Sequence, residues 1–394
     1  MVSNENSRFV HTIGIGEVMV LIIIIYMAFI SLGLPDSILG TAWPTIQLDW
    51  NLPIDAAGYI SLIGVSGSIV SSFLSGRIIR KFGTSKVTLF SCMMTGFALL
   101  GYSLAPSYIW LLLFAVPLGF GGGSVDAALN NYVATHYEAH HMNWLHSFWG
   151  IGATMGPIIM SGFLLSSWQM GYRTISLIQL SLAIILLLTL KLWPKEEVMI
   201  ADEHIKKDAI KTKGVNYALM VFMFYCMVEF STGLWGASYL VKIKLLTPDV
   251  AARLIAVYYG GITIGRIFSG FLTFKLSNQG LVRYGIYLSL VSMATLMLPL
   301  PNFALMIALL LFGFGLAPIF PAMIHETPIH FGKELSQTII GYQMAFAGIG
   351  SAFLPPIIGI VVKKTSLQTL PIILILGMFL VLISANSIFK LKSS

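Results

Sequence analysis

Charge is scarce in this chain of 394 residues, of which only 10% are Asp, Glu, Lys or Arg. Hydrophobic residues make up 57%, and the mean hydropathy is +0.85. A water-soluble globule needs more polar residues than this to cover its surface. The composition therefore excludes a soluble protein and predicts an integral membrane protein.

Cysteine is also rare, and the two that occur, Cys92 and Cys226, both lie within apolar runs. A thiol in such a run packs as a small apolar side chain, so no disulfide is expected. The first apolar run begins near residue 18, is longer than a signal-peptide core and lacks an Ala-x-Ala cleavage site. We expect this run to be retained as a membrane span.

The sequence lacks the short motifs that mark common catalytic sites. It has no Gly-Lys-Ser/Thr phosphate loop, no paired His–carboxylate metal motif and no Gly-x-Ser-x-Gly nucleophile. The net charge is +7, but the basic residues are scattered in short loops and form no dense patch, which argues against nucleic-acid binding. We expect neither an enzyme nor a nucleic-acid-binding protein, and no cofactor or metal.

Two stretches of the chain are repeated. Residues 148–152, Phe-Trp-Gly-Ile-Gly, return at 346–350 as Phe-Ala-Gly-Ile-Gly, 198 residues later. Residues 67–76, GSIVSSFLSG, match residues 261–270, GITIGRIFSG, at an offset of 194. Both repeats lie in apolar runs and predict two copies of one membrane unit. Many secondary transporters are built in this way, with the substrate site between the copies near the bilayer midplane.

Apolar stretches of about 20 residues, the length that crosses roughly 30 Å of hydrocarbon, predict an all-α fold with twelve transmembrane helices. They lie near residues 18–43, 55–79, 87–105, 109–133, 144–167, 173–193, 215–241, 250–274, 281–300, 303–324, 336–362 and 367–389. We therefore predict an N-terminal six-helix bundle at 1–193, a cytoplasmic linker at 194–213 and a C-terminal six-helix bundle at 214–394.

The distribution of basic residues predicts the orientation. With both termini in the cytoplasm, 17 of the 23 basic residues fall on the cytoplasmic side, Arg266 among them. This bias follows the positive-inside rule, and the even number of spans agrees with it. Compact loops and the absence of long extra domains favour a bacterial inner membrane.

This pattern resembles the major facilitator superfamily over the whole chain. The superfamily's loop between helices 2 and 3 usually reads Gly-x-Leu-(Ala)-Asp-(Arg)-x-Gly-(Arg)-(Lys), and GRIIRKFGTSK supplies Gly76, Ile78, Lys81 and Gly83. Arg80 stands where the family usually has an acid, so the family's charge contact at that point is not expected. The fifth-helix motif Gly-x-x-x-Gly-Pro is present at 152–157. The resemblance implies a gating role for Gly76, Arg77, Arg80 and Gly83.

Three acids, Asp36, Asp126 and Glu229, lie inside predicted spans. An ionised side chain at the centre of a span costs at least ~2.5–3.5 kcal/mol, so such residues usually mark substrate or ion pathways. Gly122, Asp126 and Asn130 are spaced at i, i+4 and i+8 and give predicted helix 4 one polar face. Burial favours the neutral form of a carboxyl group, which makes Asp126 a candidate proton carrier. The alternatives are a structural hydrogen bond for Asp126 and a wet or helix-capping position for Asp36.

One acid in helix 1 and one in helix 4 is also the arrangement of the fucose permease branch of the superfamily, the fucose:proton symporters and their hexose-transporting relatives. Carried over by position, the resemblance implies that Asp126 is the main proton-binding carboxyl and that Asp36 is a second acid needed for transport. His146 is a candidate for a proton relay, because an unperturbed histidine titrates near neutrality. A purely structural role for this histidine is the alternative.

Glu229 lies in predicted helix 7, the equivalent of helix 1 in the second copy, and is a candidate for binding sugar hydroxyls. Trp235 follows six residues later, and an aromatic face suits the C–H face of a sugar ring, although a packing role is equally open. Glu326 with His325 is interpreted as a solvated helix end or a gate contact. The remaining substrate-binding candidates are Asn130, Asn131, Tyr258, Tyr259, Tyr342 and Gln343.

The sequence thus predicts a monomeric secondary transporter in the lipid bilayer. Its expected activity is symport of H⁺ with a sugar or related polyhydroxylated solute by alternating access. Proton-driven efflux of amphipathic drugs or lipids is the alternative, supported by 19 methionines and 25 phenylalanines. A channel is disfavoured, because the chain has no filter-like repeat and its duplication suits alternating access.

Overall fold

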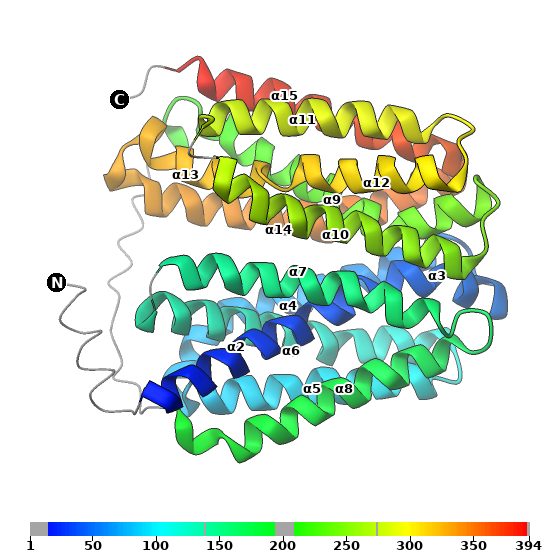
Figure 1. Cartoon of the computed structure of the whole chain (residues 1–394), viewed down its shortest axis with the longest axis horizontal. Coiled ribbons are helices and arrows are strands. Elements are labelled where there is room, and N and C mark those ends of the chain that lie inside the picture. Colours follow the sequence, from blue (N-terminus) through cyan, green and yellow to red (C-terminus); the bar gives the residue numbers. More distant parts are fainter. Residues whose placement is uncertain (1–14, 138, 194–208, 273–274, 392–394) are drawn as a thin grey trace. The chain divides into compact units, whose positions relative to one another are not determined.

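The computed structural model describes residues 15–137, 139–193, 209–272 and 275–391, and these residues are almost entirely helical (Figure 1). Helices satisfy every backbone hydrogen bond within one segment, as the bilayer interior requires. Ten helical segments of the described chain are long and apolar enough to cross a membrane. Two more, α7 (Ala139–Ser161) and α11 (Asn278–Leu296), complete the predicted twelve.

Contacts between Cα atoms divide the chain into two units, which are described separately. Unit 1 comprises Met1–Ile38 and Ile60–Ile200, and unit 2 comprises Leu39–Tyr59 and Ala201–Ser394. The segment Leu39–Tyr59 thus groups with unit 2, although it lies within the predicted N-terminal bundle. Residues 194–208 of the predicted linker lie outside the described residues.

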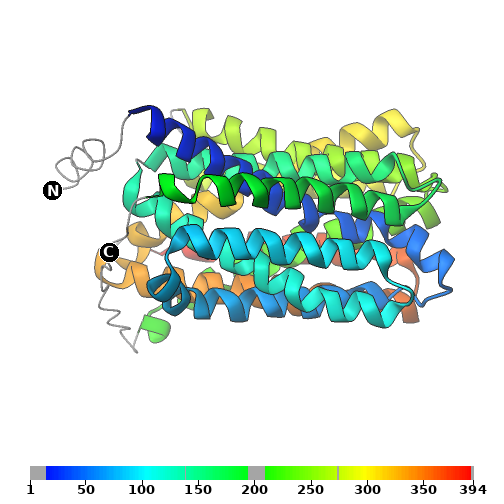
Figure 2. The ribbon, with the colours of Figure 1, turned by 90° about the horizontal axis from the view of Figure 1, so that it is seen from below.

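Unit 1 is built around three close helix pairings: α2 (Ile15–Asp36) packs against α7, and α5 (Thr84–Leu104) packs against both α6 (Tyr108–His136) and α8 (Trp168–Leu188). Figure 2 shows α5 and α6 side by side, in the cyan part of the colour scale. Between α4 and α5 the chain turns at Gly83, whose φ of 81° suits glycine far better than any L-residue with a side chain. The remaining helix of this unit is α4 (Ala56–Phe82), whose first residues, up to Tyr59, group with unit 2.

Glycines set the distance between α2 and α7. A Cβ atom on Gly33 would collide with the backbone of Trp149, and one on Gly152 would collide with the carbonyl group of Ile30. Because neither glycine has a side chain, the two helices approach to backbone contact, as is common between membrane helices. This approach brings the C-terminal turn of α2 against the middle of α7.

Unit 2 is centred on α9, which packs against both α14 and α15, while α12 packs against α10 and α11. Trp235 of α9 is fully buried; its Nε1 donates to the Pro355 carbonyl at 2.8 Å, and its ring lies against Gly359. The unit contains α3 (Ile38–Asp49), α9 (Val215–Lys242), α10 (Pro248–Leu272), α12 (Asn302–Leu316), α13 (Ile319–Phe331), α14 (Lys333–Lys364) and α15 (Leu370–Phe389) besides α11.

Two predicted spans are interrupted. The span predicted at 18–43 is divided into α2 and α3 next to Pro35, and the span predicted at 303–324 is divided into α12 and α13 at Pro318. Proline removes a backbone donor and clashes with the preceding turn, which explains both interruptions.

The segment Leu39–Tyr59 is held within unit 2 by backbone packing and by charge. A Cβ atom on Gly40 would collide with the carbonyl group of Gly233. In the loop that follows α3, Asp55 is only 5% exposed, and its carboxylate oxygens lie 3.0 and 3.1 Å from Nζ of Lys363 at the end of α14. These contacts account for the grouping of this segment with unit 2.

Candidate functional site

The most direct polar contact of an intramembrane acid in unit 1 joins α2 to α7. The indole Nε1 of Trp149 donates to Oδ2 of Asp36 at 2.8 Å. Gly33, which precedes Asp36 by about one turn, packs on the backbone of Trp149 and so fixes this approach. The side chain of Asp36 is exposed and that of Trp149 is half-buried, so both are accessible to a small solute.

Asp126 lies on α6 and is half-buried. Asn130, one turn later, donates from Nδ2 to both the carboxylate Oδ1 and the backbone oxygen of Asp126, at 2.9 Å each. Helix α6 packs against α2, so Asp126 lies on a helix that neighbours the helix of Asp36. Among the described residues no lysine or arginine forms an ion pair with either acid. The two predicted proton-coupling acids thus lie on neighbouring helices of unit 1, each with a neutral hydrogen-bond donor.

The other two candidates of unit 1 lie on exposed positions. His146 of α7 has its ring edge-on to Phe29, with the ring centroids 6.0 Å apart. Asn131 is exposed on α6, whereas its neighbour Asn130 is half-buried beside Asp126. A relay through His146 and a substrate contact of Asn131 stay predictions.

In unit 2 the buried acid is paired with a base. Glu229 of α9 is 6% exposed, and its Oε1 lies 3.6 Å from Nη2 of Arg266 on α10. Arg266 is one of the basic residues predicted on the cytoplasmic side. It lies inside α10, six residues before the end of the helix at Leu272. Its side chain is only 20% exposed, and its long stem lets the guanidinium group reach Glu229. This ion pair is a feature that the charge count missed.

Three further substrate candidates of unit 2 are fully buried and hydrogen-bonded. Trp235 bonds Pro355 as described above, and the hydroxyl of Tyr258 donates to the backbone oxygen of Glu229 at 3.3 Å. Gln343 exchanges hydrogen bonds with the hydroxyl of Thr327 at 3.0 and 3.1 Å. These side chains would have to release their partners in order to contact a solute, so a packing role competes with their predicted ligand role.

The last two candidates differ in their accessibility. Tyr259 is 6% exposed, and its hydroxyl lies where a Cβ atom on Gly233 would be. Tyr342 on α14 is half-buried. Tyr342 is therefore the more accessible of the two tyrosines.

The predicted gating residues lie at the junction of α4 and α5. Gly76, Arg77 and Arg80 are exposed in the last turns of α4, and Gly83 forms the turn itself. Both arginines are exposed, and the gating role of these four residues stays a prediction.

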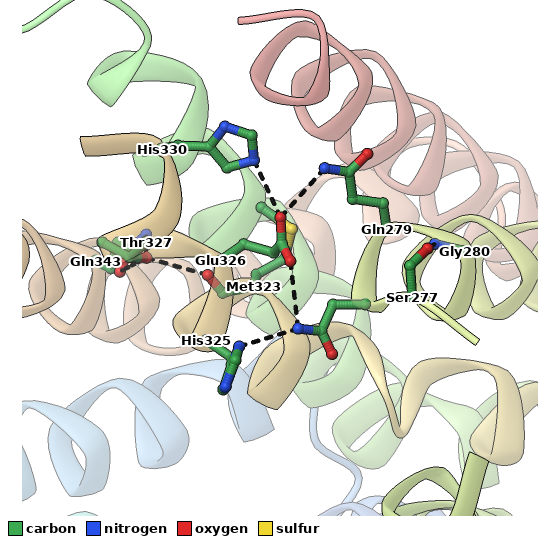
Figure 3. Close-up of polar contacts among 10 residues, drawn as sticks. Ser277, Gln279, Gly280, Met323, His325, Glu326, Thr327, His330 and Gln343 are labelled. Atoms are coloured by element: carbon green, nitrogen blue, oxygen red, sulfur yellow. Dashed lines mark hydrogen bonds and ion pairs between the residues drawn. The ribbon is translucent and has the colours of Figure 1, made fainter. Parts of the chain in front are cut away.

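A polar cluster that the sequence interpretation missed surrounds Glu326 of α13. This acid is 5% exposed and is therefore not at a solvated helix end. Figure 3 shows its carboxylate facing His330 and Gln279, with His330 Nε2 at 3.0 Å and Gln279 Nε2 at 3.3 Å. Asn278 donates to the other carboxylate oxygen at 3.2 Å. The i, i+4 spacing of Glu326 and His330 is the sequence signal that indicates their contact.

Comparison with known proteins identifies relatives over nearly the whole chain. The family model described as Major Facilitator Superfamily matches residues 25–355. The Glucose/mannose transporter GlcP of Bacillus subtilis is 22% identical over 372 residues, which cover 90% of this chain and 90% of that protein.

Two solved structures show the same fold. The D-xylose-proton symporter superposes with a TM-score of 0.76 at 13% identity, over 95% of this chain and 98% of the other. The nucleoside transporter NupG superposes with a TM-score of 0.75 at 15% identity, over 94% of this chain and 100% of the other. At these identities the likeness bears on the fold alone.

Proposed function

This chain belongs to the major facilitator superfamily, is a membrane transporter rather than an enzyme, and, we propose, couples the uptake of a sugar or related polyhydroxylated solute to H⁺. The bilayer is the bacterial inner membrane in this proposal, with both termini in the cytoplasm and the protein acting as a monomer. Solute and proton cross together by alternating access.

The observation that carries the proposal is the pair of acids in unit 1. Asp36 and Asp126 lie on the neighbouring helices α2 and α6, and their described hydrogen-bond donors, Trp149 and Asn130, are neutral. An ionised carboxyl group is costly inside the bilayer, so an acid there without a basic partner is a candidate for binding a proton. A transporter that must load and release a proton in each cycle needs such a group.

In this mechanism Asp126 is the main proton carrier. Protonation neutralises its charge and so removes the penalty of moving an ionised carboxyl group through an apolar surrounding. The loaded transporter then changes state, and deprotonation on the cytoplasmic side resets it. Asn130 stays bonded to Asp126 in both protonation states, because an amide can both donate and accept hydrogen bonds.

Several observations support a polyhydroxylated solute. The site in unit 1 offers carboxylate and amide acceptors and donors beside the indole ring of Trp149, a combination that suits the hydroxyls and the C–H face of a sugar. One relative is named as a glucose/mannose transporter. Efflux of amphipathic compounds is the competing activity.

The proposal is tested by uptake of a labelled monosaccharide panel into proteoliposomes with an imposed pH gradient. Wild type should accumulate one sugar and lose it when the gradient collapses. Asp126→Asn should abolish accumulation while sparing exchange down a sugar gradient. Asp249→Asn is the matched control, because Asp249 pairs with the exposed Arg253 at the start of α10.

Full accumulation by Asp126→Asn would refute the assignment of the proton carrier. Absence of uptake for every sugar, together with proton-driven export of an amphipathic dye, would establish the competing activity. The orientation is tested separately by cysteines at Lys81 and Lys364 in a variant that lacks Cys92 and Cys226. A membrane-impermeant maleimide added to intact cells should label only position 364.

A further inference from the structure

The glycine contacts give the register between the two copies of the repeat. Gly152 of α7 packs on the carbonyl group of Ile30 in α2, and Gly350 of α14 packs on the carbonyl group of Met223 in α9. The same contact therefore recurs with offsets of 198 for Gly152 and Gly350 and of 193 for Ile30 and Met223. Helix α9 is thus aligned with α2 by contact geometry and not only by letter similarity.

This register places two acids at equivalent positions. Asp36 lies six residues after Ile30, and Glu229 lies six residues after Met223, so both share the offset of 193. Gly40 and Gly233 share it as well. Each copy thus carries one acid at the same point of its first helix.

The second charged group differs between the copies. Gly119 packs on the carbonyl group of Gly64, and Gly313 packs on that of Tyr258, which gives an offset of 194 for both helices of this contact. At this offset Asp126 corresponds to Phe320, and Arg266 corresponds to Ser72. Between the two copies, Asp36 is therefore equivalent to Glu229, Asp126 to Phe320, and Ser72 to Arg266.

The neighbours of the two acids reflect these exchanges. Ser72 donates to the backbone oxygen of Gly123 in α6 and places no charge in unit 1. Phe320 packs on the ring of Tyr225, with the centroids 5.8 Å apart, and so fills the position of Asp126 with an apolar group. The site of unit 1 carries two acids, whereas its counterpart in unit 2 carries one acid and one arginine.

The titratable groups around Glu229 are few. Tyr225 and Cys226 lie on its own helix, and Tyr258 and Arg266 lie on α10. From α13, α14 and α15, which also pack against α9, no described acidic or basic side chain forms an ion pair with Glu229. Arg266 is thus the one described group that balances its charge.

We propose that Arg266 is a positioning residue that keeps Glu229 ionised throughout the transport cycle and so confines proton exchange to Asp36 and Asp126. This inference rests on the proposed function of proton-coupled uptake. Arginine stays protonated at every pH that proteins meet, and a carboxylate beside it is stabilised in its charged form. The duplicated acid of unit 2 therefore holds a fixed charge and does not carry a second set of protons.

Infrared difference spectroscopy of the purified full-length protein tests the inference without any solute. The absorption of protonated carboxyl groups that appears on acidification should be lost in part in Asp126→Asn and unchanged in Glu229→Gln. Arg266→Ser gives position 266 the residue type of its equivalent in unit 1, Ser72, and should add one carboxyl signal. The double variant Glu229→Gln/Arg266→Ser should lack this added signal. Arg266→Lys should retain the wild-type spectrum, because the lysine keeps the positive charge.

Transport gives the second readout. The H⁺:D-glucose ratio, measured from the reversal potential in proteoliposomes, should rise in Arg266→Ser and return to the wild-type value in Glu229→Gln/Arg266→Ser. Glu229→Gln should transport more slowly at the wild-type ratio. The inference is overturned if Glu229→Gln lowers either the infrared carboxyl signal or the H⁺:D-glucose ratio. It is also overturned if Arg266→Ser folds and gives the wild-type infrared spectrum.

Failure of the inference and failure of the proposed function are distinguishable. If wild type takes up no sugar with H⁺, the proposed function fails while the infrared result still reports whether Glu229 exchanges a proton. If Arg266→Ser does not fold, Glu229→Gln alone decides between the two outcomes, because its carboxyl signal is either unchanged or reduced.

Discussion

Trp149 of α7 donates its indole N–H to the carboxylate of Asp36 at the end of α2, over 2.8 Å. The repeat places Ala347 at the position of Trp149 in the second copy. The indole is therefore a feature of unit 1 alone, in the copy whose acid has no described ion-pair partner. This pairing makes Trp149 the first residue to test after the acids themselves.

Replacement of Trp149 by Phe should slow proton-driven uptake on the order of 10-fold, because a hydrogen bond to a charged group contributes about 1.5–3 kcal/mol. Phenylalanine keeps an aromatic ring at this position but cannot donate the hydrogen bond. Trp144→Phe is the matched control on the same helix, since that side chain is 53% exposed. Equal uptake rates for Trp149→Phe and wild type would show that the bond to Asp36 does not contribute to transport.

The ion pair between Asp55 and Lys363 should contribute measurably to the stability of unit 2. Lys363→Met leaves a buried carboxylate without its partner and should cost about 1–2 kcal/mol, less than a fully buried pair because the lysine is half exposed. Asp55→Asn/Lys363→Met should cost less than Lys363→Met alone. Thermal unfolding in detergent measures the stability of each variant, with Lys364→Met, at an exposed lysine, as the control. If the loss in the double variant equals the sum of the losses in Asp55→Asn and Lys363→Met, the two residues are not directly coupled.

Two glycine-to-alanine substitutions should change stability in opposite directions. Gly152→Ala places a methyl group against the carbonyl group of Ile30 and should destabilise the protein by about 1–3 kcal/mol. Gly341→Ala meets nothing within 4 Å and should stabilise α14 by about 0.5–1 kcal/mol, because alanine restricts the unfolded chain more than glycine does. Melting temperatures of the two variants in one detergent give the comparison; a stabilised Gly152→Ala would show that α2 and α7 separate easily.

The role of Gln343 can be separated into packing and binding. Its side chain is fully buried and both of its polar atoms bond Thr327. Gln343→Leu should therefore lower stability by about 1–3 kcal/mol, since it removes both hydrogen bonds to Thr327 and leaves that hydroxyl only its bond to the Met323 carbonyl. Thr327→Val/Gln343→Leu should recover most of this loss. A large increase in KM for D-glucose at unchanged stability would instead support direct contact with the solute.

Hydropathy sufficed for the helices, because the bilayer imposes length and apolarity on each span separately. It did not reveal the interruption at Pro318, since apolar residues continue on both sides of it. Hydropathy also could not predict the grouping of Leu39–Tyr59 with unit 2. That grouping depends on contacts between segments far apart in the chain.

The candidate site was predicted in part. The acids Asp36 and Asp126 were singled out because charge inside a span is conspicuous, and they lie on the neighbouring helices α2 and α6. The pairing of Arg266 with Glu229 was missed because this arginine was counted only by its side of the membrane, although it lies inside α10 and its long side chain reaches Glu229. Trp149 was not singled out, since a tryptophan in an apolar run carries no signal of the partner that it meets.

The unequal offsets between the two copies bear on the construction of chimeras. The offset that aligns α2 with α9 is 193 residues, whereas the contact of Gly152 recurs in α14 at an offset of 198. If α14 replaced α7 at the offset of 193, its sequence would be shifted by five residues. Five residues at about 100° each turn a helix face by roughly 140° beyond a full turn. The bare glycine face would then point away from its neighbour, so helix exchanges in this protein need a separate cut point for each helix pair.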